Sequence, residues 1–143
     1  MIEIENEHPK LRANRVALKK LLRDTILREQ KQAGSITLLM VTDRKLAKLH
    51  KEFLQDPSRT DVMTFDLSIT KAEIAGDIVV SLDRAFEQAQ EFGVTLLQET
   101  GRLAVHGILH LCGMSDRTPA LRKKMNARET WHLQQSGWIM ENQ

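Results

Sequence analysis

Residues 101–115, with the sequence GRLAVHGILHLCGMS, constrain the fold more than any other stretch of the chain. Their apolar side chains would lie nearly all the way round a helix, whereas a surface helix confines such side chains to one stripe. Gly113 follows the apolar run, and glycine tolerates the left-handed backbone that commonly ends a helix. We therefore expect a buried helix that ends near Gly113 and is enclosed by the other elements.

Two histidines within this helix, His106 and His110, have the spacing of a metal site. Residues four apart lie roughly 40° apart around a helix axis and one turn above each other, so both imidazoles can reach one ion. Asp116 is the first carboxylate after the expected turn. Two imidazoles and one carboxylate leave a position for water, as is common in zinc hydrolases. The sequence therefore predicts one Zn²⁺ ion bound by His106, His110 and Asp116.

Other potential ligands have simpler interpretations. Cys112 lies roughly 200° round the helix from His110, so it should face the core rather than the ion. His50 belongs to another expected helix and is interpreted as an ordinary, partly buried histidine. His8 and His132 stay open as alternatives, because either would complete the closed four-ligand shell of a structural metal.

The histidine pair also resembles the HExxH helix of zinc peptidases. The residue after His106 is Gly107, so the glutamate that acts as general base in those enzymes is missing. A zinc peptidase-like hydrolase therefore remains an alternative that lacks its base.

The length of 143 residues fits a single domain, residues 1–143, that can bury a core without disulfides. One cysteine excludes an intramolecular disulfide, and we find neither a long apolar run nor a signal-like N-terminus. We therefore expect a cytoplasmic protein with no membrane partner. The net charge of +2 neither requires nor excludes a nucleic acid, but basic residues gather before residue 32 and after Asp116, where they could follow phosphates.

Hydrophobic periodicity predicts the order β-α-β-α-β-β-α-α-α. We expect strands near residues 1–5, 36–42, 60–67 and 73–81, and helices near 10–32, 44–53, 84–92, 95–111 and 119–136. The strand at 73–81 contains an unbroken Ile-Val-Val run and is placed centrally in the sheet. Thr95 and Gln98 form a capping box that opens the histidine-bearing helix. The prediction is a single α+β domain, with a small mixed four-stranded β-sheet packed with about five helices.

Three segments together resemble one protein family. Residues 106–113, HGILHLCG, match the HGxLHLxG signature of the YbeY-type endoribonucleases that mature ribosomal RNA. Residues 60–65, TDVMTF, resemble the TDVLSF strand of that family, and residues 76–81, GDIVVS, resemble its GDIVIS strand. The order and spacing of the segments agree, and the resemblance runs from about Leu38 to Glu129.

The resemblance implies a zinc-dependent endoribonuclease that acts on single-stranded RNA and helps to process the 3′ end of small-subunit ribosomal RNA. It implies ribosomal RNA as a partner, together with the small ribosomal subunit or its assembly factors, and no DNA. A non-catalytic RNA- or ribosome-binding module with a structural metal is the other alternative to an enzyme.

Two positions depart from the family pattern. The family signature usually ends in tyrosine, aspartate and a third zinc-binding histidine, whereas residues 114–116 of this chain are Met-Ser-Asp. Asp116 occupies the slot of the third histidine and keeps a ligand set that suits zinc. Many members also carry an arginine soon after an aromatic residue, where this chain has Leu54. We expect Arg59, or else Arg117, to contact phosphate in its place.

Overall fold

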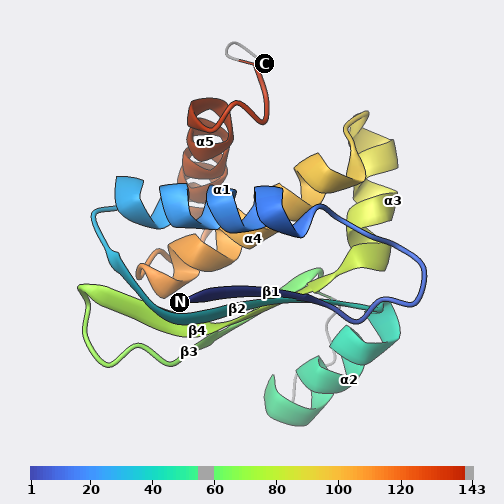
Figure 1. Cartoon of the computed structure of the whole chain (residues 1–143), viewed down its shortest axis with the longest axis horizontal. Coiled ribbons are helices and arrows are strands. Elements are labelled where there is room, and N and C mark those ends of the chain that lie inside the picture. The colour runs from blue at the N-terminus through green and yellow to red at the C-terminus, as the bar shows by residue number, and fades with distance from the viewer. Residues whose placement is uncertain (55–59, 141–143) are drawn as a thin grey trace.

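The computed structural model describes residues 1–54 and 60–140 and has the predicted order of strands and helices (Figure 1). The elements are β1 (Ile2–Asn6), α1 (Arg15–Arg28), β2 (Gln32–Val41), α2 (Asp43–Leu54), β3 (Val62–Asp66), β4 (Glu73–Ser81), α3 (Leu82–Phe92), α4 (Leu96–Leu111) and α5 (Pro119–Gln135). The predicted α+β class, with one four-stranded sheet, is confirmed. Within the described ranges, no helix has the length and apolar character needed to cross a membrane.

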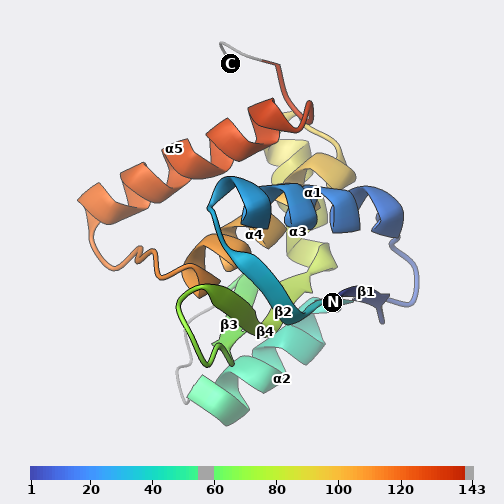
Figure 2. The same ribbon diagram turned by 60° about the vertical axis from the view of Figure 1, so that its left-hand side comes forward.

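The sheet is mixed, with the strand order β1-β2-β4-β3. β1, β2 and β4 are parallel, and β3 runs antiparallel to β4 at one edge. β4 is therefore an inner strand, as its apolar run predicts, and Ile78 and Val80 on it are fully buried. Both views show α1 and α4 on one face of the sheet and α2 on the other (Figures 1 and 2).

Helix α4 is the buried helix that the sequence predicts. It packs against β3 and β4 on one side and against α1, α3 and α5 on the others. Leu103, Ala104 and Val105 point in three different directions around the helix, and all three are buried. The capping box at Thr95 is present. The enclosure of α4 by five other elements fixes the position of the two histidines that it carries.

Helix α1 begins later than the sequence predicts, at Arg15 rather than Lys10. The N–H groups of Lys10 and Leu11 donate to Nδ1 of His8 at 3.1 and 2.9 Å, which holds this segment in a turn. Asn14 then caps the helix, because its side-chain oxygen accepts a hydrogen bond from the N–H of Ala17 at 3.0 Å. Strand β2 also begins earlier than predicted, at Gln32 rather than residue 36.

Gly107 lets α4 approach the sheet closely. A Cβ atom built on Gly107 would lie 2.5 Å from Cγ2 of Ile78, a contact that real Cβ atoms do not make. The helix therefore packs on β4 at a distance that requires glycine between His106 and Ile108.

We predict that Gly107→Ala lowers the free energy of unfolding by about 1–3 kcal/mol, because the added methyl group overpacks the contact with Ile78. Helix propensity alone favours alanine by about 1 kcal/mol, so the two effects oppose each other. Urea unfolding followed by circular dichroism measures the change. The double variant Gly107→Ala/Ile78→Ala should lose less stability than the sum of the single variants. A Gly107→Ala protein as stable as the wild type would contradict this packing.

Candidate metal centre

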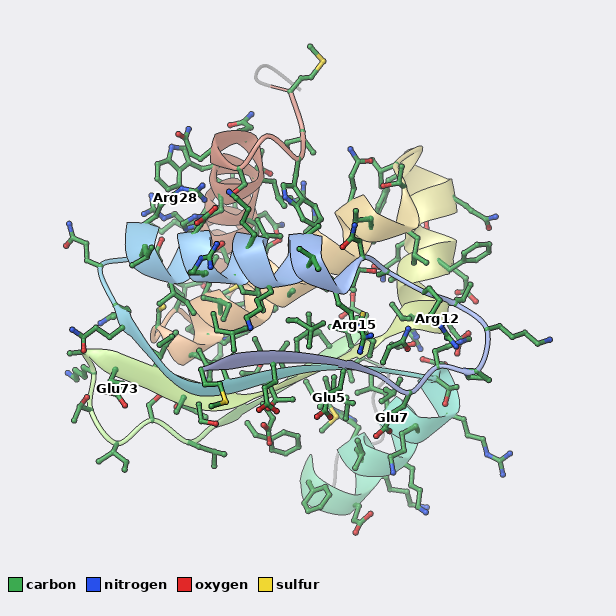
Figure 3. All side chains as sticks on the ribbon, viewed as in Figure 1. Glu5, Glu7, Arg12, Arg15, Arg28 and Glu73 are labelled. Carbon is green, nitrogen blue, oxygen red and sulfur yellow. The ribbon has the colours of Figure 1, made fainter. Side chains whose placement is uncertain are left out.

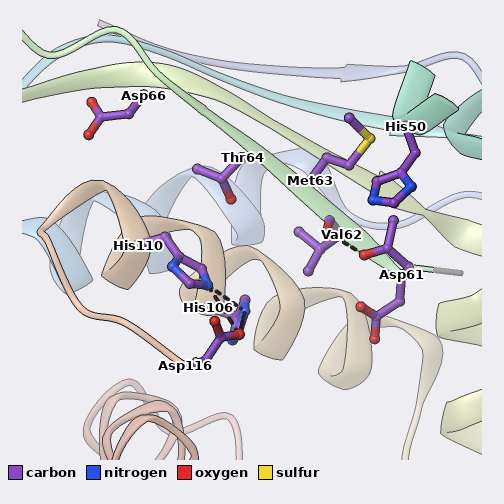
Figure 4. A pocket seen from close by; sticks show the side chains of 10 residues that line it. His50, Asp61, Val62, Met63, Thr64, Asp66, His106, His110 and Asp116 are labelled. Atoms are coloured by element: carbon purple, nitrogen blue, oxygen red, sulfur yellow. Dashed lines mark hydrogen bonds and ion pairs between the residues drawn. The ribbon is translucent and has the colours of Figure 1, made fainter. Parts of the chain in front are cut away.

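The three predicted ligands lie together in the structure (Figure 4). His106 and His110 lie on consecutive turns near the end of α4, and Asp116 lies on the loop that follows. Gly113 has the expected left-handed backbone, with a φ of 96°. The N–H groups of Gly113 and Met114 bond back to the last turn of α4 at 2.9 and 3.0 Å. This turn directs the chain back so that Asp116 faces both imidazoles.

The distances within the cluster fit a tetrahedral ion. The two Nε2 atoms of His106 and His110 are 3.0 Å apart. Oδ2 of Asp116 lies 3.5 Å from the first and 3.4 Å from the second. Zinc bonds of about 2.0–2.1 Å place neighbouring ligand atoms of a tetrahedron about 3.3–3.4 Å apart. The three atoms therefore occupy the corners of one tetrahedral face and can hold a metal ion.

Glu129 on α5 orients the first histidine. Nδ1–H of His106 donates to Oε2 of Glu129 at 2.7 Å, which leaves Nε2 of His106 free for an ion. Arg102 lies near the other carboxylate oxygen, with its Nη1 atom at 3.6 Å. Burial by itself would lower the pKa of His106, but the hydrogen bond and charge of Glu129, with the charge of Asp116, raise it overall. Pairing a ligand histidine with a carboxylate is the usual support of a metal site.

Sequence reasoning missed Glu129. One signal was available, because Glu129 lies four residues from both Met125 and Leu133, on the stripe of α5 that faces the core. A carboxylate in an apolar stripe needs a buried partner, and the exposed fraction of Glu129 is only 3%. The identity of that partner depends on how α5 crosses α4.

The alternative histidines lie elsewhere. Nε2 of His8 is 2.8 Å from Asp83, and Nε2 of His132 is 2.6 Å from Glu29. His132 on α5 is fully buried. Arg28, in the last turn of α1 (Figure 3), donates to Ser136 at 2.8 Å. Neither His8 nor His132 joins the cluster of His106, His110 and Asp116.

The other residues that the sequence analysis considered for the site lie in different places. Arg59 lies outside the described residues, and Arg117 is exposed on the loop after Asp116. Cys112 packs against the main core, and burial raises the pKa of its thiol to about 11, so it remains protonated. His50 is buried, yet it lines the same pocket as the candidate ligands (Figure 4).

This pocket, the metal cleft, has a volume of about 500 Å³ and lies between the C-terminal part of α4 and the edge strand β3. His106, His110 and Asp116 line one wall, and residues 60–64 with Asp66 line the other. The three candidate ligands keep 20–38% of their side-chain surface exposed. An ion bound here would therefore face a cleft that is open to solvent.

A further buried carboxyl, Glu99, lies on α4 two turns before His106. Its exposed fraction is 4%. Burial raises the pKa of Glu99 to about 7, with Arg102 opposing and the charges of Asp61 and Glu129 adding to the shift. No motif or spacing in the sequence singles out this residue.

Known proteins resemble the chain along most of its length. A family model described as "Endoribonuclease YbeY" matches residues 2–137. An "Endoribonuclease YbeY" of Flavobacterium johnsoniae is 35% identical over 116 residues, which span 81% of this chain and 83% of the relative. Another, of Carboxydothermus hydrogenoformans, is 40% identical over 88 residues, or 61% of this chain and 62% of the relative.

One solved structure is similar throughout. The solution structure of a Thermotoga maritima protein has a TM-score of 0.61 and 23% sequence identity, and the match covers 100% of this chain and 99% of that one. This likeness supports the arrangement of strands and helices described above.

Glu99 should make the stability of the protein depend on pH. Its pKa rises from an ordinary 4.5 to about 7 on folding, so the free energy of unfolding should fall as pH rises through this range. The contribution is roughly 3 kcal/mol. Glu99→Gln removes this contribution. The free energy of unfolding, measured with urea, should therefore fall less between pH 4.5 and 7 in the variant than in the wild type. Glu87→Gln, the same change at an exposed position of α3, should keep the wild-type slope. Equal slopes for Glu99→Gln and wild type would contradict the shift.

Proposed function

The chain belongs to the endoribonuclease YbeY family, and from that membership we propose that it is a zinc-dependent endoribonuclease acting on single-stranded RNA in ribosomal RNA maturation. The convergence of His106, His110 and Asp116 in an open cleft carries the proposal. The proposed partners are ribosomal RNA, with processing at the 3′ end of the small-subunit RNA, and the small ribosomal subunit or its assembly factors. The proposed compartment is the cytoplasm.

Zinc suits this cluster better than magnesium or calcium. Two of the three donors are imidazole nitrogens, whereas magnesium and calcium prefer oxygen ligands throughout. When bound, zinc supplies a Lewis acid for a phosphoryl oxygen and activates water for hydrolysis.

The protein's own residues position the ion and the RNA. Glu129 holds His106 so that its Nε2 faces the metal cleft. Arg122 donates to the carbonyl oxygen of Asp116 at 3.3 Å and so supports the loop that carries the third ligand. We propose that Arg59, or else Arg117, which is exposed on that loop, contacts the phosphate of the scissile bond.

Two other functions have weaker support. An HExxH peptidase needs a glutamate at the position of Gly107, where even a Cβ atom would collide with Ile78. A purely structural metal needs a closed shell of four ligands. The cluster found among the described residues offers three, and all three side chains keep access to solvent.

We predict near-stoichiometric zinc in the purified protein, measured by elemental analysis. His110→Ala and Asp116→Ala each remove one of the three ligands, so both variants should lose the bound zinc. Asp66→Asn changes a carboxylate of the same cleft outside the cluster and should retain it. Glu129→Gln keeps all three ligands and should bind zinc about 10–100-fold more weakly. Zinc retained after Asp116→Ala would mean that another residue is the third ligand.

We also predict that the zinc-loaded protein cleaves a single-stranded RNA oligonucleotide at neutral pH and leaves a peptide mixture intact. His110→Ala should reduce the rate about 100-fold or more, because it disrupts the site that stabilises the reacting phosphoryl group. Product analysis in a single turnover identifies the nucleophile, since attack by the 2′-hydroxyl leaves a cyclic phosphate and attack by water does not. Cleavage of peptides without cleavage of RNA would contradict the proposal.

A further inference from the structure

A second cleft opens beside the metal cleft. It has a volume of about 260 Å³ and lies among α3, α4 and α5, which pack on one another through α4. We call it the side cleft, and its polar and aromatic lining includes Gln88, Phe92, Glu99, Arg102 and Asn126. The two clefts share Asp61, Val62 and His106, so a chain bound at the metal centre can extend into the side cleft.

Glu99 is the unusual residue of the side cleft. It is 96% buried, given its exposed fraction of 4%, and it lines both the side cleft and the pocket of about 420 Å³ that continues along α4. Within the described part of the chain, no hydrogen bond reaches its carboxyl group. The described residues contain no fully buried carboxyl oxygen without a partner, so the oxygens of Glu99 reach the surface of these pockets, where a ligand can pair with them.

The surrounding groups favour a flat, polar ligand. Nε2 of Gln88 donates to Asp61 at 3.1 Å, which leaves the amide oxygen of Gln88 available. Arg102 uses Nη1 to reach Thr130 at 3.3 Å, and its other donors remain available among the described residues. Phe92 is 62% exposed at the rim of the cleft. An exposed aromatic ring beside hydrogen-bonding groups suits a nucleobase, which stacks through its face and is read at its edge.

We propose that the side cleft binds an unpaired nucleobase next to the scissile phosphodiester, and that Glu99 selects bases with an exocyclic amino group over uracil. This inference rests on the proposed endoribonuclease function. Above its pKa of about 7, Glu99 is an ionised carboxylate that only accepts hydrogen bonds, and it accepts one from the amino group of adenine, cytosine or guanine. Uracil has no amino group, and its single N3–H lies between two carbonyl oxygens that repel a carboxyl oxygen.

Glu99→Gln tests the selection, because an amide both donates and accepts and so pairs with uracil as well. Oligonucleotides that carry each base in turn beside the cleavage site are compared through kcat/KM at about pH 8.5, where Glu99 is ionised. We expect the wild type to favour the amino-bearing bases over uracil by at least about 5-fold. In Glu99→Gln the preference should vanish while zinc content is unchanged. Glu87→Gln, on the exposed side of α3, should keep the wild-type preference.

A binding measurement separates this inference from the proposed function. AMP, CMP, GMP and UMP are titrated into wild-type protein and Glu99→Gln at the same pH, and binding is followed by NMR chemical shifts. We expect shifts at Phe92 and Glu99, weaker binding of UMP by the wild type, and loss of that difference in the variant. Cleavage of RNA without any base preference, or a preference that survives Glu99→Gln, overturns the inference and leaves the endoribonuclease standing. If RNA is not cleaved, the enzymatic proposal fails, and equal binding of all four nucleotides overturns this inference as well.

Discussion

The burial of α4 is the constraint on which the rest of the structure depends. A helix with apolar side chains on all sides cannot lie on a surface, so the sheet and α1, α3 and α5 surround it. His106 and His110 can meet solvent only where this enclosure is incomplete, between the end of α4 and the edge strand β3. The position of the metal cleft is thus a result of core packing, and Gly107 contributes by letting the helix rest directly on Ile78.

The charges around α4 explain how an acidic site can act on RNA. Asp61, Asp116 and Glu129 surround His106, and their field raises its pKa. Such a field repels a phosphodiester until a divalent cation is present, which neutralises most of the local negative charge. Arg102 offsets only part of this negative field, because its one positive charge lies 3.6 Å from Glu129 and faces three carboxylates in all. The proposed binding of RNA therefore depends on the proposed binding of the ion.

Local signals were enough to predict the frame of the site. The capping box at Thr95, the turn at Gly113 and the spacing of the histidines involve residues close together in the sequence, and the structure contains all three. The start of α1 could not be predicted, because the His8 ring that accepts from Lys10 and Leu11 also bonds to Asp83, which is 75 residues away in the sequence. Glu129 was missed for a similar reason, since α5 must cross α4 before this carboxylate can meet a histidine 23 residues away.

The turn at Gly113 has a consequence for the cost of assembling the metal centre. All three proposed ligands come from residues 106–116, so no long loop must be closed to bring them together. Backbone hydrogen bonds from Gly113 and Met114 already hold the returning segment against the last turn of the helix. The entropy of ordering the ligands is therefore lost when the domain folds, and an arriving ion meets a preorganised site.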